Sequence, residues 1–575
     1  MATLFKPHEA TGPPPTSAFV METYRQAYAK RVADGSLRPL LILYHFYGYL
    51  ILIAYLCIPH TKRPWLYAAR WPVLAAILAF QWKSLHEATS MSMAFGFATG
   101  LISIWGGVWS ITWLVLMKPQ FEQKRVQGRP KKAEEAQNEG LHANGHINGH
   151  TNGSTATNGS AKSSKGGDAV LRNRREARDA RKGNGQETED SQVVIAPRQS
   201  TLKPTSLDYE PGMDASMEYY WQAYPEKLSE RIPWVLDLII NFRMPGWNCQ
   251  IPPLPALPPS MKQALGEPVD AASRTGVSSV GLQRYDTRRA LLKARLPWFI
   301  AGYFALDILK VVMMNDPYFI VGPTTYDLPW YLRDRSPHAL QFIRQSISSY
   351  SIIISLEMVF LMCPLGMSIL LGPRVLGLQG QAFYYATTWG SWSNVTHKGL
   401  NGLWGGWWHQ TFRFAFSAPS NYLIKNGYVK AHTTLARMTA LFYAFAISGV
   451  IHAGGSITQF PRTYWWHCPA FFMLQAVGIL IQSTSCALLH PLIKKLPKPI
   501  RRWGNFFYVF FWLLFTGHWL TDDFATGGIW LYEPIPFSPL RGLGFGEPDA
   551  KFYCWDHIGV GWYTGKHWWE SGIAL

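Results

Sequence analysis

The chain has few cysteines, and no two of them are spaced as a metal or redox pair. Six Cys are spread over 575 residues, and none forms a Cys-x-x-Cys motif. A disulfide framework and a structural zinc site are therefore not expected. Four of the six lie in or beside apolar stretches, where a free Cys packs as a small hydrophobic residue.

Acidic residues are also scarce. The chain has 36 Asp and Glu against 54 Lys and Arg, which gives a formal net charge of +18. A basic balance of this size fits either nucleic acid or anionic lipid as a partner. Many of the basic residues flank apolar segments, where they would face anionic lipid on the cytosolic side. We therefore expect a lipid bilayer as the partner and no nucleic acid.

Long apolar runs dominate the chain, although its mean hydropathy is only −0.04. Residues 39–58 form a run of twenty without a formal charge, which is long enough to cross a bilayer. Residues 92–117 form a longer run, and residues 71–82 a shorter one that is ambiguous. The other apolar runs are 297–314, 347–372, 438–451, 471–489 and 506–520. We predict an all-α, polytopic membrane protein with about eight to nine membrane helices.

A polar segment interrupts these runs at residues 118–205. It is rich in Asn, Gly, Ser and charge, and has too little apolar surface to fold, so it is predicted to be a disordered loop. Basic residues directly after Met117 place this loop in the cytosol. The expected parts of the chain are therefore residues 1–117, with an N-terminal tail and the first membrane helices, the loop 118–205, and a core 206–575.

Two shorter features have plain interpretations. His142, His146 and His150 recur every four residues, but the Asn-Gly pairs between them oppose a helix, so a metal site is not expected there. Residues 233–240 are apolar but too short to span, and they favour an interfacial or re-entrant helix that Pro245 ends.

One histidine ends an apolar run. His452 lies in "LFYAFAISGVIHAGGSITQF", and a polar group in such a segment is a functional candidate. Apolar surroundings keep the imidazole neutral and able to accept a proton. Gly449, one turn before it, lets a helix or a substrate come close. The alternative is a histidine that serves helix packing by bonding to a backbone carbonyl, and the sequence leaves both possibilities open.

A second group of polar residues lies in "NGLWGGWWHQTFRFAF", residues 401–416. An interfacial aromatic belt explains the Trp and Phe residues of this stretch, but it explains His409, Gln410 and Arg413 less well. His409 and Arg413 are four residues apart, so on a helix they would share one face. Asn401, eight residues before His409, would lie near the same side.

Four motifs, in order, resemble a known family. "LWGGWWHQTFR" is similar to the "FWGRRWHQ.FR" signature of wax-synthase-like proteins, a fungal branch of the membrane-bound O-acyltransferases (MBOAT). "SGVIHAGG" resembles their "SG..H" element, which carries the catalytic His. "IPWVLDLIINFRMPGW" and "EPIPFSPLRGLGFG" also resemble stretches of these proteins. One departure is clear: Gly406 and Trp407 stand where the family often has two Arg.

The resemblance implies an MBOAT-like fold, with residues 206–575 as the acyltransferase core in a multi-pass protein of the endoplasmic reticulum. It implies acyl transfer from acyl-CoA, with acetyl-CoA favoured as the co-substrate, to a hydrophobic alcohol, and no bound cofactor or metal. A terpenoid or mixed polyketide–terpenoid acceptor of fungal secondary metabolism is favoured over wax or sterol ester synthesis. The predicted catalytic residues are His452 and His409, and the predicted substrate-binding residues are Asn401, Trp404, Trp408, Gln410, Arg413 and Gly449.

This chemistry makes physical sense of the polar residues. A hydroxyl attacks a thioester well only when a base takes its proton, and neutral His452 would be that base. The developing oxyanion needs hydrogen-bond donors, which His409, Gln410 or Asn401 could supply. Burial in the membrane would keep water, the competing nucleophile, away.

Two other interpretations of the sequence were open. His518 and Asp522 match the HxxxD pattern of soluble acyl-CoA-dependent acyltransferases, but they fit a polar pair at a helix end better. Asp307, Lys310 and Glu357 lie in apolar runs and would suit a transporter. Transporters often have two related halves, and none is visible here.

Overall fold

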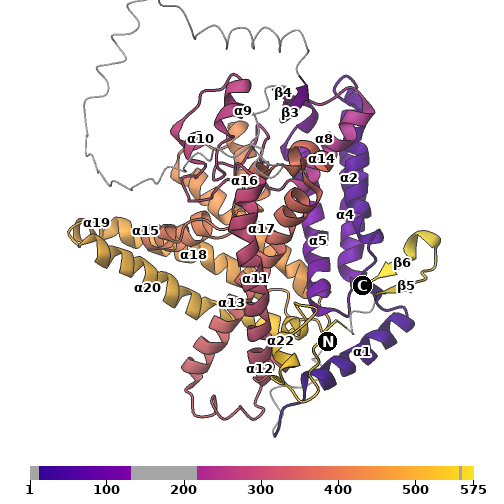
Figure 1. Cartoon of the computed structure of the whole chain (residues 1–575), viewed down its shortest axis with the longest axis vertical. Coiled ribbons are helices and arrows are strands. Elements are labelled where there is room, and N and C mark those ends of the chain that lie inside the picture. Colours follow the sequence, from indigo (N-terminus) through magenta and orange to yellow (C-terminus); the bar gives the residue numbers. More distant parts are fainter. Residues whose placement is uncertain (1–11, 131–216, 556–559) are drawn as a thin grey trace, which may run out of the picture. The chain divides into compact units, whose positions relative to one another are not determined.

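The computed structural model describes residues 12–130, 217–555 and 560–575, which all belong to one compact unit. These residues are mostly helical, and their strands form three two-stranded sheets (Figure 1). The prediction of a mainly α-helical protein is therefore confirmed. The three spaced histidines, and the part of the predicted loop from residue 131 onward, lie outside the described residues.

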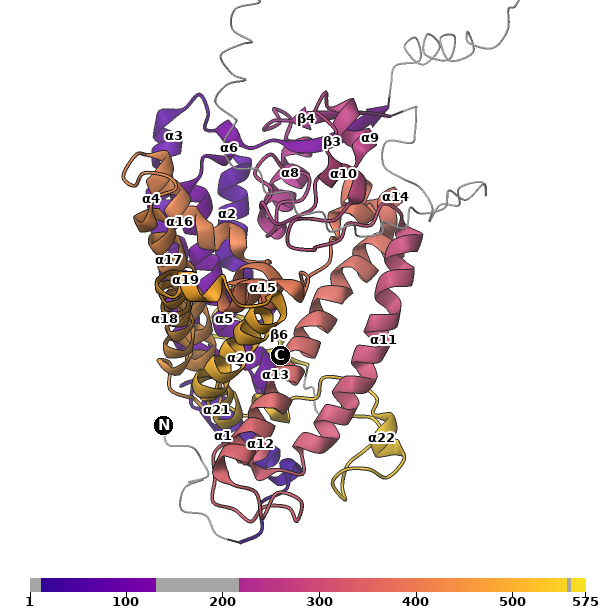
Figure 2. The ribbon, with the colours of Figure 1, turned by 90° about the vertical axis from the view of Figure 1, so that its left-hand side faces the viewer.

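Within the residues that the structure describes, five helical segments are long and apolar enough to cross a membrane. All five match predicted apolar runs, and two of them, α11 and α13, lie side by side over much of their length (Figure 2). The segments are α5 with its π-helical extension (Met93–Leu116), α11 (Arg288–Met313), α13 and the turns after it (Pro337–Gly380), α17 (Thr434–Thr458) and α18 (His467–Leu488). The count of eight to nine stays a prediction.

The first predicted span is wrong in length. Residues 39–58 do not form one helix, because α2 covers only Tyr47–Cys57 after a short 3₁₀ turn, η1 (Tyr44–Phe46). The residues before it are held extended: β1 (Arg38–Pro39) pairs in parallel with β2 (Ala88–Thr89). The backbone at the start of this run is therefore paired with another strand and is not available to extend the helix to twenty residues.

Close contacts between small residues pack α17 against α5. A Cβ atom on Gly100 of α5 would lie 1.9 Å from the carbonyl oxygen of Gly454, and one on Gly455 would lie 2.4 Å from the Phe97 ring. The two backbones can approach this closely only because side chains are absent. The contact fixes the segment of α17 that carries His452.

We expect Gly100→Ala to lower the stability of the bundle by roughly 1–3 kcal/mol, because the new methyl group would meet backbone that cannot rotate away. Thermal unfolding of the purified protein in detergent measures this. The matched control is Gly504→Ala on α20 (Lys498–Thr516), where a Cβ meets nothing within 4 Å. Equal melting temperatures for the two variants would contradict the proposed packing.

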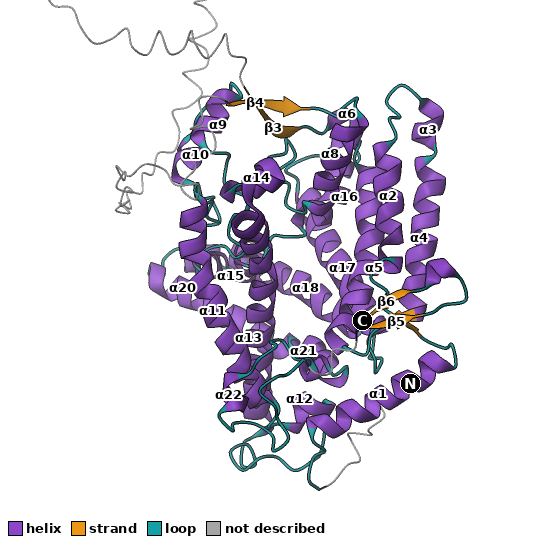
Figure 3. Cartoon of the chain, turned by 45° about the vertical axis from the view of Figure 1, so that its right-hand side comes forward, coloured by secondary structure: helices purple, strands orange, loops and turns teal. Residues whose placement is uncertain are grey.

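The first residues of the predicted disordered loop are ordered, although their composition is polar. Residues 119–130 form α6 (Pro119–Glu122) and β3 (Arg125–Pro130), and β3 pairs antiparallel with β4 (Met217–Gln222) (Figure 3). The predicted start of the disordered loop at residue 118 is therefore wrong. The reason is Arg125, which is 2% exposed and bonded on several sides, so it orders the residues around it.

The predicted short helix is α8 (Leu228–Ile240), which ends before Pro245. Its Trp234, Val235 and Leu238 are fully buried in a cluster with residues of α2 and α5. The Trp109 indole also donates a hydrogen bond to the carbonyl of Ile239, at 2.9 Å. Helix α8 therefore buries its apolar face in protein.

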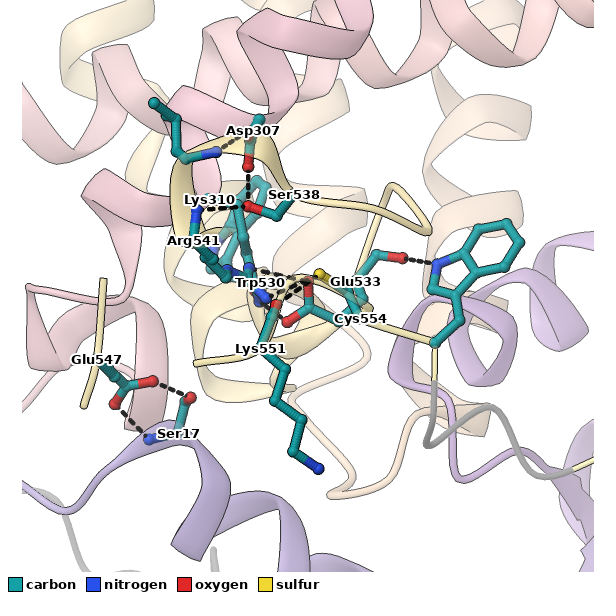
Figure 4. Close-up of polar contacts among 12 residues, drawn as sticks. Ser17, Asp307, Lys310, Trp530, Glu533, Ser538, Arg541, Glu547, Lys551 and Cys554 are labelled. Atoms are coloured by element: carbon teal, nitrogen blue, oxygen red, sulfur yellow. Dashed lines mark hydrogen bonds and ion pairs between the residues drawn. The ribbon is translucent and has the colours of Figure 1, made fainter. Parts of the chain in front are cut away.

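The loop at "EPIPFSPLRGLGFG" is anchored by Asp307 and Lys310, two of the charged residues of α11 (Figure 4). Lys310 donates to the carbonyl of Trp530 at 2.6 Å and lies 3.6 Å from the Glu533 carboxylate. Asp307 accepts hydrogen bonds from the Ser538 hydroxyl and from the backbone N–H of Leu540. Asp307 and Lys310 therefore both have hydrogen-bond or ion-pair partners within the protein.

The other elements connect these segments. The remaining α-helices are α1 (Ser17–Ala33), α3 (Pro64–Ala68), α4 (Arg70–Glu87), α9 (Pro259–Ala264), α10 (Ala271–Thr275), α12 (Pro317–Val321), α14 (Gly372–Leu376), α15 (Ser393–Gly402), α16 (Arg413–Lys425), α19 (His490–Ile493), α21 (His518–Thr526) and α22 (Pro539–Gly542). The last sheet is the antiparallel pair β5 (Gly561–Tyr563) and β6 (Gly572–Ala574).

Candidate active site

A large cavity contains both candidate histidines. Its volume is about 2420 Å³, and its lining comes mainly from α2, α5, α13, α17, α18 and α20 and from the Trp-rich stretch. Aliphatic and aromatic side chains form most of the wall. The lining residues include His409 and His452 but no Asp, Glu or Lys. The cavity therefore suits an apolar molecule that reacts at a few polar groups.

His452 is held in one orientation. Its Nδ1 donates a hydrogen bond to the carbonyl of Ser448, one turn earlier on α17, at 2.8 Å. In the neutral ring, Nε2 is then the nitrogen that can accept a proton. The ring packs against Phe472 at 4.5 Å and Phe97 at 6.3 Å between centroids. The carbonyl bond expected of a helix-packing histidine is present, and the ring also lines the cavity, so the catalytic role stays a prediction.

His409 lies in a break between helices. The π-helix η7 (Leu403–Trp407) ends before it, and α16 begins at Arg413. The expectation that His409 and Arg413 share one helix face is therefore wrong. Arg413 instead closes the turn, because its Nη1 donates to the carbonyl of Gly405 at 3.0 Å and to Oε1 of Gln410 at 2.7 Å.

Gln410 stabilises this turn from within. Its side-chain amide donates to the carbonyls of Trp404 and Trp408. Both amide hydrogens are thus used by the backbone. The geometry gives Gln410 a positioning role, and does not support the predicted donation to an oxyanion.

The His409 imidazole is surrounded by aromatic rings. Phe360, Trp389, Trp408 and Phe412 lie 5.3 to 5.9 Å from it between centroids. Burial lowers the pKa of His409 to about 3, and the nearby His452 contributes to this, so the ring is neutral at physiological pH. Its Nδ1 is buried and has no hydrogen-bond partner among the described residues.

One member of this cage was not singled out from the sequence. Trp389 donates its indole N–H to Glu357 at 2.8 Å, and Glu357 pairs with Arg295 at 2.7 Å. The three residues come from distant parts of the chain, so no local spacing indicates them. Glu357, which suited a transporter in the sequence, thus positions an aromatic ring that packs against His409.

The remaining predicted substrate-binding residues differ in whether they line the cavity. Asn401, Trp404 and Trp408 line the cavity. Asn401 is exposed to it, and the indole N–H of Trp404 is buried without an acceptor in the described part of the chain. Gly449 does not line it: a Cβ there would lie 2.9 Å from Pro469, so this glycine serves the contact of α17 with α18.

The HxxxD pair is part of the helical framework. Asp522 accepts a hydrogen bond from the Tyr318 hydroxyl at 2.7 Å, and Nδ1 of His518 donates to the carbonyl of Phe515 at 3.0 Å. Neither side chain lines the cavity. Within residues 12–130, 217–555 and 560–575, no group of three or more His, Cys, Asp or Glu is placed to hold a metal ion.

Comparison with known proteins points to the same segment. Residues 385–474 match the model of the membrane bound O-acyl transferase family. Over 85 residues the chain is 34% identical to the acetyltransferase spyB of Aspergillus fumigatus, covering 15% of this chain and 14% of that protein. Over 322 residues it is 24% identical to the O-mevalon transferase yanI of Aspergillus niger, covering 51% of this chain and 62% of that protein.

The matches therefore span less than two thirds of either relative. No solved structure matches the chain. The family segment contains both candidate histidines and the Trp-rich stretch between Asn401 and Phe416. The resemblance predicted from the motifs is thereby confirmed for this segment, which is similar to the membrane bound O-acyl transferase family and to two Aspergillus transferases.

Proposed function

We propose that this protein is an O-acyltransferase that moves an acetyl group from acetyl-CoA to a hydroxyl of a hydrophobic acceptor. The observation that carries the proposal is the orientation of His452, whose Nδ1 is fixed by the Ser448 carbonyl while its ring lines an apolar cavity. A base with one protonation site committed to the backbone presents the other to a substrate.

The proposed step needs no covalent enzyme intermediate. Nε2 of His452 takes the proton of the acceptor hydroxyl as its oxygen attacks the thioester carbonyl. Asn401, the Trp404 indole and His409 are the groups that could donate hydrogen bonds to the oxyanion. When the carbon–sulfur bond breaks, the thiolate of CoA takes the proton back from His452, so the histidine is regenerated.

We favour a terpenoid or mixed polyketide–terpenoid acceptor in fungal secondary metabolism, and a location in the endoplasmic reticulum. The two relatives, an acetyltransferase and an O-mevalon transferase, support a small acyl group over a wax or sterol ester. A cavity of about 2420 Å³ has room for a multi-ring acceptor beside the donor arm.

The deciding assay uses membranes that contain the protein, radiolabelled acetyl-CoA and longer acyl-CoAs, and a panel of terpenoid, sterol and fatty alcohols. We expect an acetyl ester of at least one terpenoid alcohol. Esters formed only with long-chain donors would favour the wax or sterol ester alternative. Failure with every pair would overturn the proposal.

A transporter has less support. Its candidate residues Asp307 and Lys310 hold the loop after α21, and Glu357 holds Trp389 through one hydrogen bond. None of the three lines the cavity. Their partners are groups of the protein itself, and so these residues are explained without a transported ion.

We also propose that α2, α4 and α20 contact lipid, which would bring the membrane segments to the predicted eight to nine. Helix α20 exposes Trp503, Phe507, Phe511 and Phe515 at intervals of four residues, each 48–68% exposed. Such an apolar stripe without a protein partner in the described part of the chain suits a membrane environment.

A further inference from the structure

The cavity wall carries positive charge that no carboxylate of the lining balances. Among its lining residues, the formally charged ones are Arg413 and Arg437, and none is Asp, Glu or Lys. Neither arginine has a carboxylate within 4 Å in the described residues. Arg437 is exposed and can be solvated by water, but Arg413 is partly buried, where an unpaired charge costs free energy that a ligand counter-ion would offset.

Arg413 is the more informative of the two, because it ends the turn that carries His409 and lines the same cavity as both histidines. Its Nη1 bonds to Gly405 and Gln410, and both of these acceptors are uncharged. The guanidinium lines the cavity on the turn that carries His409. Burial lowers the pKa of Arg413 from its usual range, and no neighbouring carboxylate counters this.

A second guanidinium strengthens the positive potential near His409. Arg243 donates to the carbonyls of Ala386 at 2.8 Å and Thr387 at 2.9 Å, and it too has no carboxylate partner in the described part of the chain. Its charge is close enough to contribute to the lowered pKa of His409. Arg243 therefore adds to the positive potential at His409, while Arg413 carries its own charge in the cavity wall.

We propose that Arg413 receives an anionic group of a substrate, a carboxylate or a phosphate, in the cavity that both histidines line. This rests on the proposed acyl transfer, and it narrows the substrate class to apolar molecules that carry a fixed negative charge. The guanidinium keeps its contacts with Gly405 and Gln410 and binds the anion with the N–H groups that these contacts do not use.

Distances from the histidines indicate whether the acyl donor or the acceptor carries the anion that Arg413 binds. Arg437 is fifteen residues before His452 on α17, so it lies ~22 Å away along the helix axis. In CoA the diphosphate is about 13 bonds from the sulfur, which spans ~15 Å when extended. A thioester at the histidines would thus place its phosphates toward Arg437, and an anion at Arg413 fits a carboxylate of the acceptor better.

The experiment measures binding first. Purified full-length protein in detergent is titrated, by quenching of Trp fluorescence, with two pairs: oleanolic acid and methyl oleanolate, and 16-hydroxyhexadecanoic acid and its methyl ester. We expect the wild type to bind at least one acid about ten-fold more tightly than its ester. Arg413→Gln should lose this preference, Arg413→Lys should retain part of it, and Arg437→Gln should keep it.

A second binding comparison shows whether the anion belongs to the acyl donor or to the acceptor. Acetyl-CoA is compared with the uncharged thioester S-acetyl-N-acetylcysteamine in the same variants. A preference for acetyl-CoA that depends on Arg413, with no acid–ester difference, would assign the anion to the donor phosphate and still support the anion site. Equal affinities in both comparisons, or preferences that survive Arg413→Gln, would overturn the inference.

The two proposals fail separately. If the acids bind in an Arg413-dependent way but no acyl group is transferred to any alcohol, the anion site stands and the acyl-transfer proposal falls. If transfer occurs and Arg413→Gln lowers it equally for acids and esters, the arginine only holds the His409 turn. In that case the anion site falls and the acyl-transfer proposal stands.

Discussion

Replacing His452 with Ala should lower acyl transfer by roughly 10²–10⁴-fold, the range expected when a positioned general base is removed. The rings packed against it, Phe97 and Phe472, cannot accept a proton in its place. The folded protein should be little changed, since within the described residues the ring makes one hydrogen bond, to Ser448 on the same helix.

The measurement compares initial rates in membranes with equal amounts of each variant, judged by immunoblot. His518→Ala is the matched control, because His518 also bonds through Nδ1 to a nearby carbonyl, that of Phe515 at the end of α20, but does not line the cavity. We expect near wild-type rates for the control. Normal turnover by the His452 variant, or equal losses in both, would remove His452 from the role of base.

The sequence predicted the two histidines of the site because polar residues in apolar runs are rare. It could not predict the break between Trp407 and Arg413, because a helical spacing of four residues says nothing about whether the helix continues. The break is fixed by tertiary contacts: a Cβ on Gly406 would lie 2.7 Å from the Asn394 side chain. The same contact explains why an Arg, which relatives of the motif often have there, does not fit here.

The roles of Gly449 and Glu357 show a second limit. A glycine beside a candidate base can admit either a substrate or a helix, and only the position of Pro469 on α18 decides for the helix. Glu357 is an intramembrane carboxylate, and its function depends on Trp389, which lies 32 residues away in sequence. Sequence patterns identify such residues as unusual but do not identify their partners.

The fold was predicted where hydrophobicity alone decides it. Five long apolar runs became the long helices, since no other structure satisfies the backbone within a membrane. The errors lie where pairing over long distances competes with local pattern. Strand pairing of Arg38–Pro39 shortened the first helix, and the buried Arg125 ordered a segment whose composition is polar.

Replacing Asp237 with Ala should destabilise the protein by about 3–5 kcal/mol, because it leaves a buried arginine without its carboxylate. Asp237 lies 3.4 Å from Nη1 of Arg125 and accepts the Trp247 indole N–H at 3.0 Å. Arg125 and Asp237 are 2% and 4% exposed. Without Asp237, the guanidinium keeps only uncharged partners, the Gln222 side chain and the Pro233 carbonyl.

The matched control is Glu218→Ala, which breaks a pair with Arg129 on the same two strands, where the side chains are 40% and 61% exposed. An exposed pair contributes less than about 1 kcal/mol, so the control should unfold close to the wild-type temperature in detergent. A large difference would show that Arg125 needs a buried counter-ion to join β3, β4 and α8. Equal melting temperatures would mean that the packing of Trp234 and Trp247 holds these elements together without the charge pair.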